Sequence, residues 1–365
     1  MLVSVTGGTG FVGAHSVAAI VGMGHRVRML VRDTAKVKRA LMPLNVDLDA
    51  VDVVTGDITD EGGVARAMRG ADAVLHAASV YSFDSRLRAA MRRVNERGTE
   101  LVLGAARRAG ADPIVHVSSI VAMFPASGRV IDENSPVGRP RETYMASKAA
   151  AEVIARRHQA EGSPVVITYP PALLGPHDPN LGDQNARVRN ALRGLTPLWP
   201  LGGFPIGDVR DTAALHARLL TSSRSGPTGD PAPTGDPAPN GHVEPNRHFG
   251  PGRYLSTRQY VKVLREVTGR TLPTIFLPAR GMIPVGLLVD LVQQVWPWHI
   301  PAEYGAIYTC ACATRPAEGV STYGISPRPI AETVGDTVRW LHASGQLSAR
   351  QAGSGRPSLS SVPTQ

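Results

Sequence analysis

The chain has 365 residues, of which 42% are hydrophobic, so it is long enough for one large domain or two interleaved domains around a buried core. The net charge is +9, from 39 Lys and Arg against 30 Asp and Glu. The basic residues form no run of five or six and do not alternate with aromatic residues, which argues against a nucleic-acid partner. The excess of Arg beside abundant Ala, Gly and Pro is typical of a GC-rich bacterial genome.

A glycine-spaced turn follows the first predicted strand, residues 2–5, and precedes a predicted helix over residues 14–21. The first glycine permits a tight turn, the second lets the backbone approach a phosphate, and the third lets the helix pack on the strand. The amides at the helix N-terminus then face the anion. The sequence therefore predicts a dinucleotide cradle, formed by Thr6, Gly7, Gly10, Phe11, Val12 and Gly13.

Further strands are predicted over residues 27–31, 51–54, 73–76, 114–117 and 165–169, with helical segments between them. Such alternation is typical of a parallel sheet with helices on both faces. The expected fold class is α/β, a Rossmann-type doubly wound sheet with a smaller, mixed C-terminal substrate domain. Ligands bind such sheets at the carboxyl ends of the strands, so each strand exit is a candidate contact.

The residues after the second strand distinguish between cofactors. A carboxylate there binds the ribose hydroxyls of NAD, whereas an arginine accommodates the 2′-phosphate of NADP. Arg32 follows the strand directly, with Lys36 and Arg39 close behind, and a guanidinium can bind phosphate through two hydrogen bonds. NADP(H) is favoured. Asp33 keeps NAD(H) as the alternative, and Arg32 could equally be a solvated loop residue.

Tyr144 and Lys148 are four residues apart in a strongly helix-forming segment, so both project from one face. A nearby cation can lower the pKa of a phenol toward the range of general acid and base catalysis. Ser119 leaves the fifth strand and can hydrogen-bond the same substrate oxygen. We predict that these three are catalytic residues and that no metal takes part, although a Tyr and Lys pair alone could be an exposed surface pair.

Regular alternation ends after residue 175. We expect the nucleotide-binding domain over 1–175, with 207–225 returning to it, and the substrate-binding domain over 176–206 and 240–347. The tandem Thr-Gly-Asp-Pro-Ala-Pro repeat lies in 226–239 and predicts a mobile loop, and the tail 348–365 is expected to be disordered.

The first strand begins at residue 2, which leaves no room for a secretion signal, so a cytoplasmic protein is expected. The apolar stretch 282–298 is too interrupted to span a bilayer, although it could touch a membrane surface. Cys310 and Cys312 are expected to be packing residues, because neighbours two apart cannot easily form a disulfide with each other.

Taken together, these motifs resemble the extended short-chain dehydrogenase/reductases, also described as the NAD-dependent epimerase/dehydratase family. The resemblance rests on the glycine turn, Gly56-Asp57-Ile58, His76-Ala77-Ala78, Val94 to Thr99, Val117-Ser118-Ser119, Tyr144 to Lys148, Pro170 to Pro176 and Asp208-Val209-Arg210-Asp211. It covers almost the whole folded length. The Val31-Arg32-Asp33 pattern is most similar to dihydroflavonol-reductase-like and 3β-hydroxysteroid-dehydrogenase-like members.

The resemblance also implies roles for single residues. Asp57 and Ile58 would lie at the adenine, and Ala77 and Ala78, with Ser79 after them, at the pyrophosphate and nicotinamide ribose. Lys148 would bind the ribose hydroxyls, and Pro170 would pass under the nicotinamide. Asn95 would shape the site, although an Asn there could equally be a helix cap.

For the reaction, the first hypothesis is an NADP-dependent oxidoreductase that interconverts a carbonyl and an alcohol on a moderately apolar small molecule. Aromatic candidates for substrate contacts are Tyr81, Phe83, Phe124 and Phe204. In a dehydratase of this family an Asp-Glu pair follows the catalytic hydroxyl residue. In this chain Ile120-Val121 follow Ser119 instead. The alternatives are an NAD-dependent sugar-nucleotide epimerase, for which Arg187, Arg189, Arg193 and Arg210 could clamp a diphosphate, and a non-catalytic NADP-binding regulator. Members of this family often form homodimers.

Overall fold

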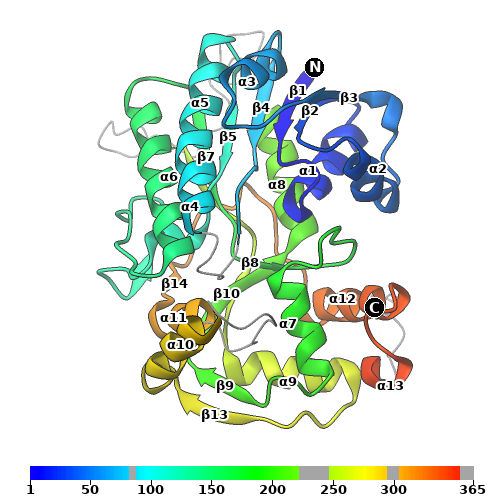
Figure 1. Cartoon of the computed structure of the whole chain (residues 1–365), viewed down its shortest axis with the longest axis vertical. Coiled ribbons are helices and arrows are strands. Elements are labelled where there is room, and N and C mark those ends of the chain that lie inside the picture. Colours follow the sequence, from blue (N-terminus) through cyan, green and yellow to red (C-terminus); the bar gives the residue numbers. More distant parts are fainter. Residues whose placement is uncertain (82–87, 222–245, 294–303, 354–365) are drawn as a thin grey trace.

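A computed structural model describes residues 1–81, 88–221, 246–293 and 304–353. Its largest element is a seven-stranded parallel sheet in the order β11-β7-β5-β4-β1-β2-β3 (Figure 1). Short apolar, β-branched segments form these strands, and β4, β5 and β7 are buried throughout. The strands are β1 (Leu2–Thr6), β2 (Arg26–Val31), β3 (Val51–Thr55), β4 (Ala73–His76), β5 (Ile114–Val117), β7 (Val165–Tyr169) and β11 (Arg247–Phe249).

Helices cover both faces of this sheet, and each face has its own apolar core. One face carries α1 (Phe11–Gly22), α2 (Ala35–Leu41) and α8 (Val209–Thr221). The other carries α3 (Glu61–Met68), α5 (Gly98–Arg108) and α6 (Thr143–Ala160), with α4 (Arg88–Met91) and the π-helical turn η4 (Arg92–Arg97) before α5. The predicted Rossmann-type class is confirmed.

A smaller unit with a third core lies beyond the carboxyl ends of the strands (Figure 1). It contains a sheet of β8 (Ala172–Leu174), β10 (Gly203–Asp208) and β12 (Arg253–Ser256), and a parallel pair of β9 (Leu198–Leu201) and β13 (Ile275–Pro278). Its helices are α7 (Asp183–Leu192), α9 (Thr257–Thr268), α10 (Ala279–Gln293), α11 (Tyr304–Cys312), α12 (Ile330–Ala343) and α13 (Ala349–Ala352). A short pair of β6 (Val130–Ile131) and β14 (Arg315–Pro316) completes the sheets.

Two expected domain boundaries need correction. Residues 247–249 were assigned to the substrate domain, but they form β11, which extends the large sheet beside β7. The tail is ordered to Gly353, because Ser348 caps α13 with a capping box and Gly353 packs so closely on α9 that a Cβ there would lie 1.9 Å from the Thr268 carbonyl oxygen. Helix α8 packs against α1, as expected for a segment that returns to the first domain.

The tandem repeat lies between residues 222 and 245, outside the described residues. The end of the tail, beyond residue 353, also lies outside them. No helix in the part that the structure describes is long and apolar enough to cross a membrane. Cys310 and Cys312 are free thiols, and burial raises the pKa of the Cys310 thiol to about 11. Burial also raises the pKa of the Cys312 thiol, so both thiols are protonated at neutral pH.

Candidate active site

The glycine turn joins β1 to α1 with no space for larger residues. Gly7 has a φ of +78°, and a Cβ there would lie 2.5 Å from the Ala78 amide nitrogen at the end of β4. A Cβ on Gly13 would lie 2.1 Å from the Gly7 carbonyl oxygen. Gly10 is the N-cap residue of α1, so the first-turn amides are not used by a side-chain cap and can donate to an anion. This cradle fits the pyrophosphate of a dinucleotide.

Two adjoining cavities open at this turn, and they share Gly7, Gly10, Ala77, Ser79 and Asn180. The first has a volume of about 400 Å³ and the second about 360 Å³. Of the predicted residues, the first is also lined by Phe11, Val12, Gly13, Ser119, Tyr144, Lys148 and Pro170, and the second by Arg32, Lys36, Asp57, Ile58 and Ala78. Predicted residues from seven separate segments of the sequence thus meet in one cleft.

Basic and acidic side chains line the second cavity together. Arg32 and Lys36 line one side of it, with Asp33, whose carboxylate accepts a hydrogen bond from the Ala35 amide at 3.0 Å. Asp57 accepts from the Thr59 amide at 2.8 Å and the Thr59 hydroxyl at 2.7 Å. Burial opposes ionisation of Asp57, but these hydrogen bonds and the charges of Arg32 and Arg93 lower its pKa overall. These residues fit the adenosine half of a nicotinamide dinucleotide.

Three predicted cofactor contacts, Thr6, Arg39 and Asn95, do not line either cavity. Thr6 is fully buried, and its hydroxyl shares a 2.7 Å hydrogen bond with the His76 ring and accepts a 3.4 Å bond from the Ala78 amide. It therefore positions the end of β4 and does not line the cleft. Arg39 donates to the Pro179 carbonyl at 2.7 Å and to the Asn180 amide oxygen at 3.2 Å, so it holds the neighbouring loop.

Asn95 lies within the π-helical turn η4 and is 2% exposed. Its Oδ1 accepts from the Val80 amide at 2.7 Å and the Ser79 hydroxyl at 3.1 Å, and its Nδ2 donates to the Ser147 hydroxyl at 2.9 Å. Asn95 is thus neither a helix cap nor part of the cleft wall. It ties the loop after β4 to the helix that carries Tyr144.

Helix α6 carries both Tyr144 and Lys148 into the first cavity. The Glu142 carboxylate caps this helix by accepting from the Tyr144 amide at 3.0 Å and the Met145 amide at 2.8 Å. The Ser119 side chain, at the exit of β5, hydrogen-bonds the Tyr144 side chain. Lys148 Nζ donates to the Val117 carbonyl at 3.4 Å. The three predicted catalytic residues therefore converge at one end of the cleft.

The expected effect of Lys148 on Tyr144 is wrong for this state of the chain. Burial raises the pKa of Tyr144 well above its usual range, and the hydrogen bond from Ser119 opposes this only in part. Burial also lowers the pKa of Lys148 to about 8. His76, beside Lys148, has its pKa lowered to about 3 by burial and is neutral at pH 7. Burial is thus the largest influence on the pKa of both Tyr144 and Lys148.

The surface of the first cavity is mostly apolar. Tyr81, Phe124 and Phe204 line it, as predicted, whereas Phe83 lies outside the described residues. Arg187, considered from the sequence as a diphosphate contact, also lines it. The sequence analysis missed other residues of this wall, because they come from the second unit. Those residues are Asp178, Asn180, Asp183 and Gln184 around the start of α7, and Ala306, Thr309 and Cys310 on α11.

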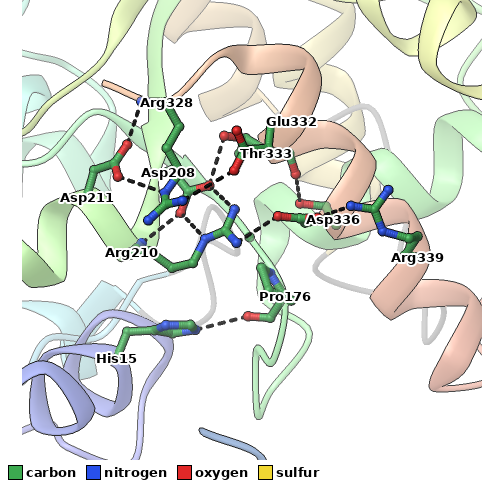
Figure 2. A network of polar contacts seen from close by, with 12 residues as sticks. His15, Pro176, Asp208, Arg210, Asp211, Arg328, Glu332, Thr333, Asp336 and Arg339 are labelled. Carbon is green, nitrogen blue, oxygen red and sulfur yellow. Dashed lines mark hydrogen bonds and ion pairs between the residues drawn. The ribbon is translucent and has the colours of Figure 1, made fainter. Parts of the chain in front are cut away.

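Only one of the four arginines considered for a diphosphate lines the described cleft, and it is Arg187. Arg193 donates to the Gln346 carbonyl at 2.6 Å, and Arg189 to the Gln346 side chain at 3.4 Å. Arg210 belongs to the ion-pair network in Figure 2, with Nη2–Asp208 Oδ2 and Nη1–Asp336 Oδ2 distances of 2.7 Å. The guanidinium groups of Arg189, Arg193 and Arg210 therefore bind residues of the second unit.

The network in Figure 2 fixes the second unit to the first. Thr333 of α12 donates to Asp208 Oδ2 at 2.8 Å, at the end of β10. Arg328 Nε lies 2.9 Å from Asp211 Oδ1 on α8, and the His15 ring on α1 contacts the Pro176 carbonyl at 3.0 Å. The Asp-Val-Arg-Asp motif therefore holds the two units together beside the cleft.

Comparisons with known proteins agree with this geometry. A family model described as the NAD dependent epimerase/dehydratase family matches residues 3–232. The chain is 35% identical to a dihydroflavonol 4-reductase-like protein of Synechocystis over 58% of this chain and 61% of that protein. It is 26% identical to sterol demethylase protein B of Methylococcus capsulatus over 95% of this chain and 100% of that protein. The fold matches UDP-glucose 4-epimerase from Bifidobacterium longum with a TM-score of 0.69 and 17% identity, over 95% and 99% of the two chains.

Proposed function

The chain belongs to the NAD-dependent epimerase/dehydratase family, and we propose that it is an NADP-dependent oxidoreductase that interconverts a carbonyl and an alcohol on a moderately apolar small molecule. The observation that carries this proposal is the convergence of Ser119, Tyr144 and Lys148 at the end of a cleft that begins at the glycine turn. A nicotinamide cofactor, when bound, would supply or accept the hydride.

Tyr144 is the proton donor in the direction of reduction. An unperturbed phenol is already protonated at neutral pH, and burial raises the pKa of Tyr144 further, so the proton is present and can pass to a carbonyl oxygen as hydride reaches the carbonyl carbon. Ser119 already hydrogen-bonds the phenol and would orient the same oxygen. In the opposite direction Tyr144 would first lose its proton, and its phenolate would then take the proton from the alcohol.

Lys148 holds a positive charge near Tyr144, whose oxygen becomes negative when it gives up its proton. Its pKa of about 8 leaves the ammonium group mostly protonated at pH 7. A buried cation interacts more strongly than one in water, so it stabilises the phenolate that remains after proton transfer. The contact with the Val117 carbonyl fixes the amine at the exit of β5.

The preference for NADP rests on charge in the second cavity. Arg32 and Lys36 line it together, and a 2′-phosphate would be matched by both cations. Asp33, which favours NAD in other proteins of this fold, already accepts a hydrogen bond from Ala35 and lies 3.9 Å from Lys36 Nζ.

The apolar wall supports the proposed substrate class. Tyr81, Phe124 and Phe204 line the cavity near the catalytic end, and three of the four arginines considered for a diphosphate are engaged elsewhere. Names of relatives such as the sterol demethylase protein B agree with an apolar substrate.

A sugar-nucleotide epimerase is the second candidate, because Arg187 lines the cavity and the fold matches UDP-glucose 4-epimerase. An epimerase keeps its cofactor through both half-reactions. Mass spectrometry of the nucleotide that copurifies, followed by an absorbance screen of NADPH oxidation against steroid, flavonoid-like and sugar-nucleotide carbonyls, separates the two. Consumption of NADPH with an apolar ketone supports the oxidoreductase. Tightly bound NAD and product formation without net consumption of added cofactor would refute it.

A further inference from the structure

Exposed apolar side chains gather on one part of the second unit. Eight of the fifteen large hydrophobic side chains that are exposed among the described residues lie on or beside β9, β13 and α10, although these elements make up a small part of the chain. We call this set the apolar rim, and it consists of Leu195, Leu198, Ile275, Leu277, Val285, Leu287, Leu288 and Val292. The three elements contact one another, so the side chains form one region and are not scattered.

Helix α10 has two different faces. On one face Gly286 packs against α11 so closely that a Cβ there would lie 3.0 Å from Tyr304 Cα. Val285, Leu288 and Val292 follow the spacing i, i+3, i+7 and form another stripe, which is exposed to between 38% and 60%. A helix that keeps an apolar stripe in water is typical of a surface that docks on something apolar.

Basic residues accompany the rim. The sequences of α9, β9, β13 and α10 contain the cations Arg258, Lys262, Arg265 and Arg280 against the acids Glu266 and Asp290. Arg280 is exposed at the start of α10, and the exposed Arg258 lies over the Phe276 ring of β13 with its Cζ 4.6 Å from the ring centroid. An apolar stripe with adjacent cations is complementary to an anionic bilayer surface.

The rim is also next to the active-site cleft. Helix α11, on which α10 packs, supplies Ala306, Thr309 and Cys310 to the wall of the first cavity. Figure 1 shows α10 and α11 side by side at the left of the second unit. A bilayer against α10 would therefore lie one helix away from the first cavity.

We propose that the apolar rim docks on the surface of an anionic lipid bilayer and that the cleft takes a substrate dissolved in that bilayer. The docking does not depend on the oxidoreductase activity, whereas the substrate class, a lipid-soluble ketone or alcohol, rests on the proposed function. The rim inserts its side chains between lipids while Arg258 and Arg280 face the headgroups.

Charge favours the bilayer over a second copy of the chain. In a twofold-symmetric dimer through this rim, the same patch meets itself, so the cations of one copy approach those of the other. Such like charges destabilise an interface. Anionic headgroups interact favourably with the same cations.

The test is cosedimentation of the full chain with phosphatidylcholine vesicles, with and without phosphatidylglycerol. Leu288→Glu places a charge on a side chain that is 60% exposed, so folding is preserved. Met42→Glu is the matched control, because Met42 is also 60% exposed but lies on the nucleotide-binding unit. Binding of NADPH, followed by fluorescence, checks that each variant is folded.

The wild-type chain and Met42→Glu should sediment with the mixed vesicles, and Leu288→Glu should lower the partition coefficient at least about tenfold. Arg280→Ala should weaken binding to mixed vesicles by about fivefold and leave binding to phosphatidylcholine alone unchanged. Failure of the wild-type chain to sediment, or equal loss in Leu288→Glu and Met42→Glu, overturns the proposal. So does a wild-type dimer that Leu288→Glu splits without any effect on vesicles. None of these readouts needs turnover, so a failed docking proposal and a failed functional proposal are told apart.

Discussion

The Tyr81 ring stands edge-on to the Tyr144 ring, with ring centroids 4.6 Å apart and the planes at 76°. Both residues line the first cavity. Burial and the neighbouring Tyr81 raise the pKa of Tyr144, so its phenol is protonated at neutral pH. Tyr144, the proposed proton donor, therefore carries its phenolic proton before a ketone enters.

Tyr144→Phe removes the phenolic hydroxyl and keeps the ring. We expect turnover to fall by about 10²- to 10⁴-fold, because the proton donor is lost, while NADPH affinity is retained. Single-turnover oxidation of NADPH and fluorescence titration measure the two quantities. Tyr81→Phe keeps the ring contact and is the control. Wild-type turnover in Tyr144→Phe would remove Tyr144 from the mechanism.

Arg32→Ala tests the cofactor preference. Loss of a charge-assisted phosphate contact should weaken NADPH binding by about 10- to 100-fold and change NADH binding little. Isothermal titration with both nucleotides gives the ratio. Arg39→Ala is the comparison, because the Arg39 guanidinium binds Pro179 and Asn180 instead of lining the cavity. Equal losses for NADPH and NADH in Arg32→Ala would contradict the preference for NADP.

Gly13→Ala tests the glycine cradle. The new methyl group would meet the Gly7 carbonyl oxygen at 2.1 Å, so either the turn shifts or α1 moves off β1. We expect nucleotide binding to be lost and Tm to fall. Gly22→Ala, in the same helix, meets nothing within 4 Å and should stabilise the chain by up to about 1 kcal/mol. Nucleotide binding by Gly13→Ala at wild-type affinity would exclude this turn as the site.

Lys148→Met should stabilise the protein while it abolishes activity. Burial lowers the pKa of Lys148 to about 8, so the desolvated ammonium group lowers the free energy of unfolding at neutral pH. The gain should be on the order of 3 kcal/mol, measured by urea unfolding near pH 7. Lys262→Met, at an exposed side chain, is the control.

The pH dependence has a definite sign. Between the folded pKa of about 8 and the unfolded value of 10.5, the unfolded chain binds more protons at Lys148, so the wild-type free energy of unfolding rises with pH. The advantage of Lys148→Met should therefore shrink as pH increases through this window. An advantage that is absent at pH 7 or that widens toward high pH would show that Lys148 is not held as a buried cation.

Much of the nucleotide-binding unit could be predicted because local patterns determine it. The predicted strands at 73–76, 114–117 and 165–169 coincide with β4, β5 and β7, and the glycine turn lies between β1 and α1. Short apolar runs between turn residues identify buried parallel strands. The sequence also predicts that Ser119 and Tyr144 lie close together. Ser119 directly follows a predicted strand, and Tyr144 shares a helix face with Lys148.

The rest depends on contacts between segments that are far apart in the sequence. β11 has three residues and lies in the large sheet only because it pairs with β7, some eighty residues earlier along the chain, which no local pattern indicates. Asn95 resembles a helix cap, yet its amide bonds the loop after β4 and Ser147. The high pKa of Tyr144 likewise reflects how deeply the folded chain buries it.

A crystal structure of the chain with bound NADPH tests the central claim most directly. The account predicts the 2′-phosphate within hydrogen-bond distance of Arg32, the pyrophosphate on the turn at Gly10, and the nicotinamide ring beside the Tyr144 hydroxyl. A cofactor bound with its nicotinamide away from Tyr144, or outside the cleft that begins at Gly7, would contradict it.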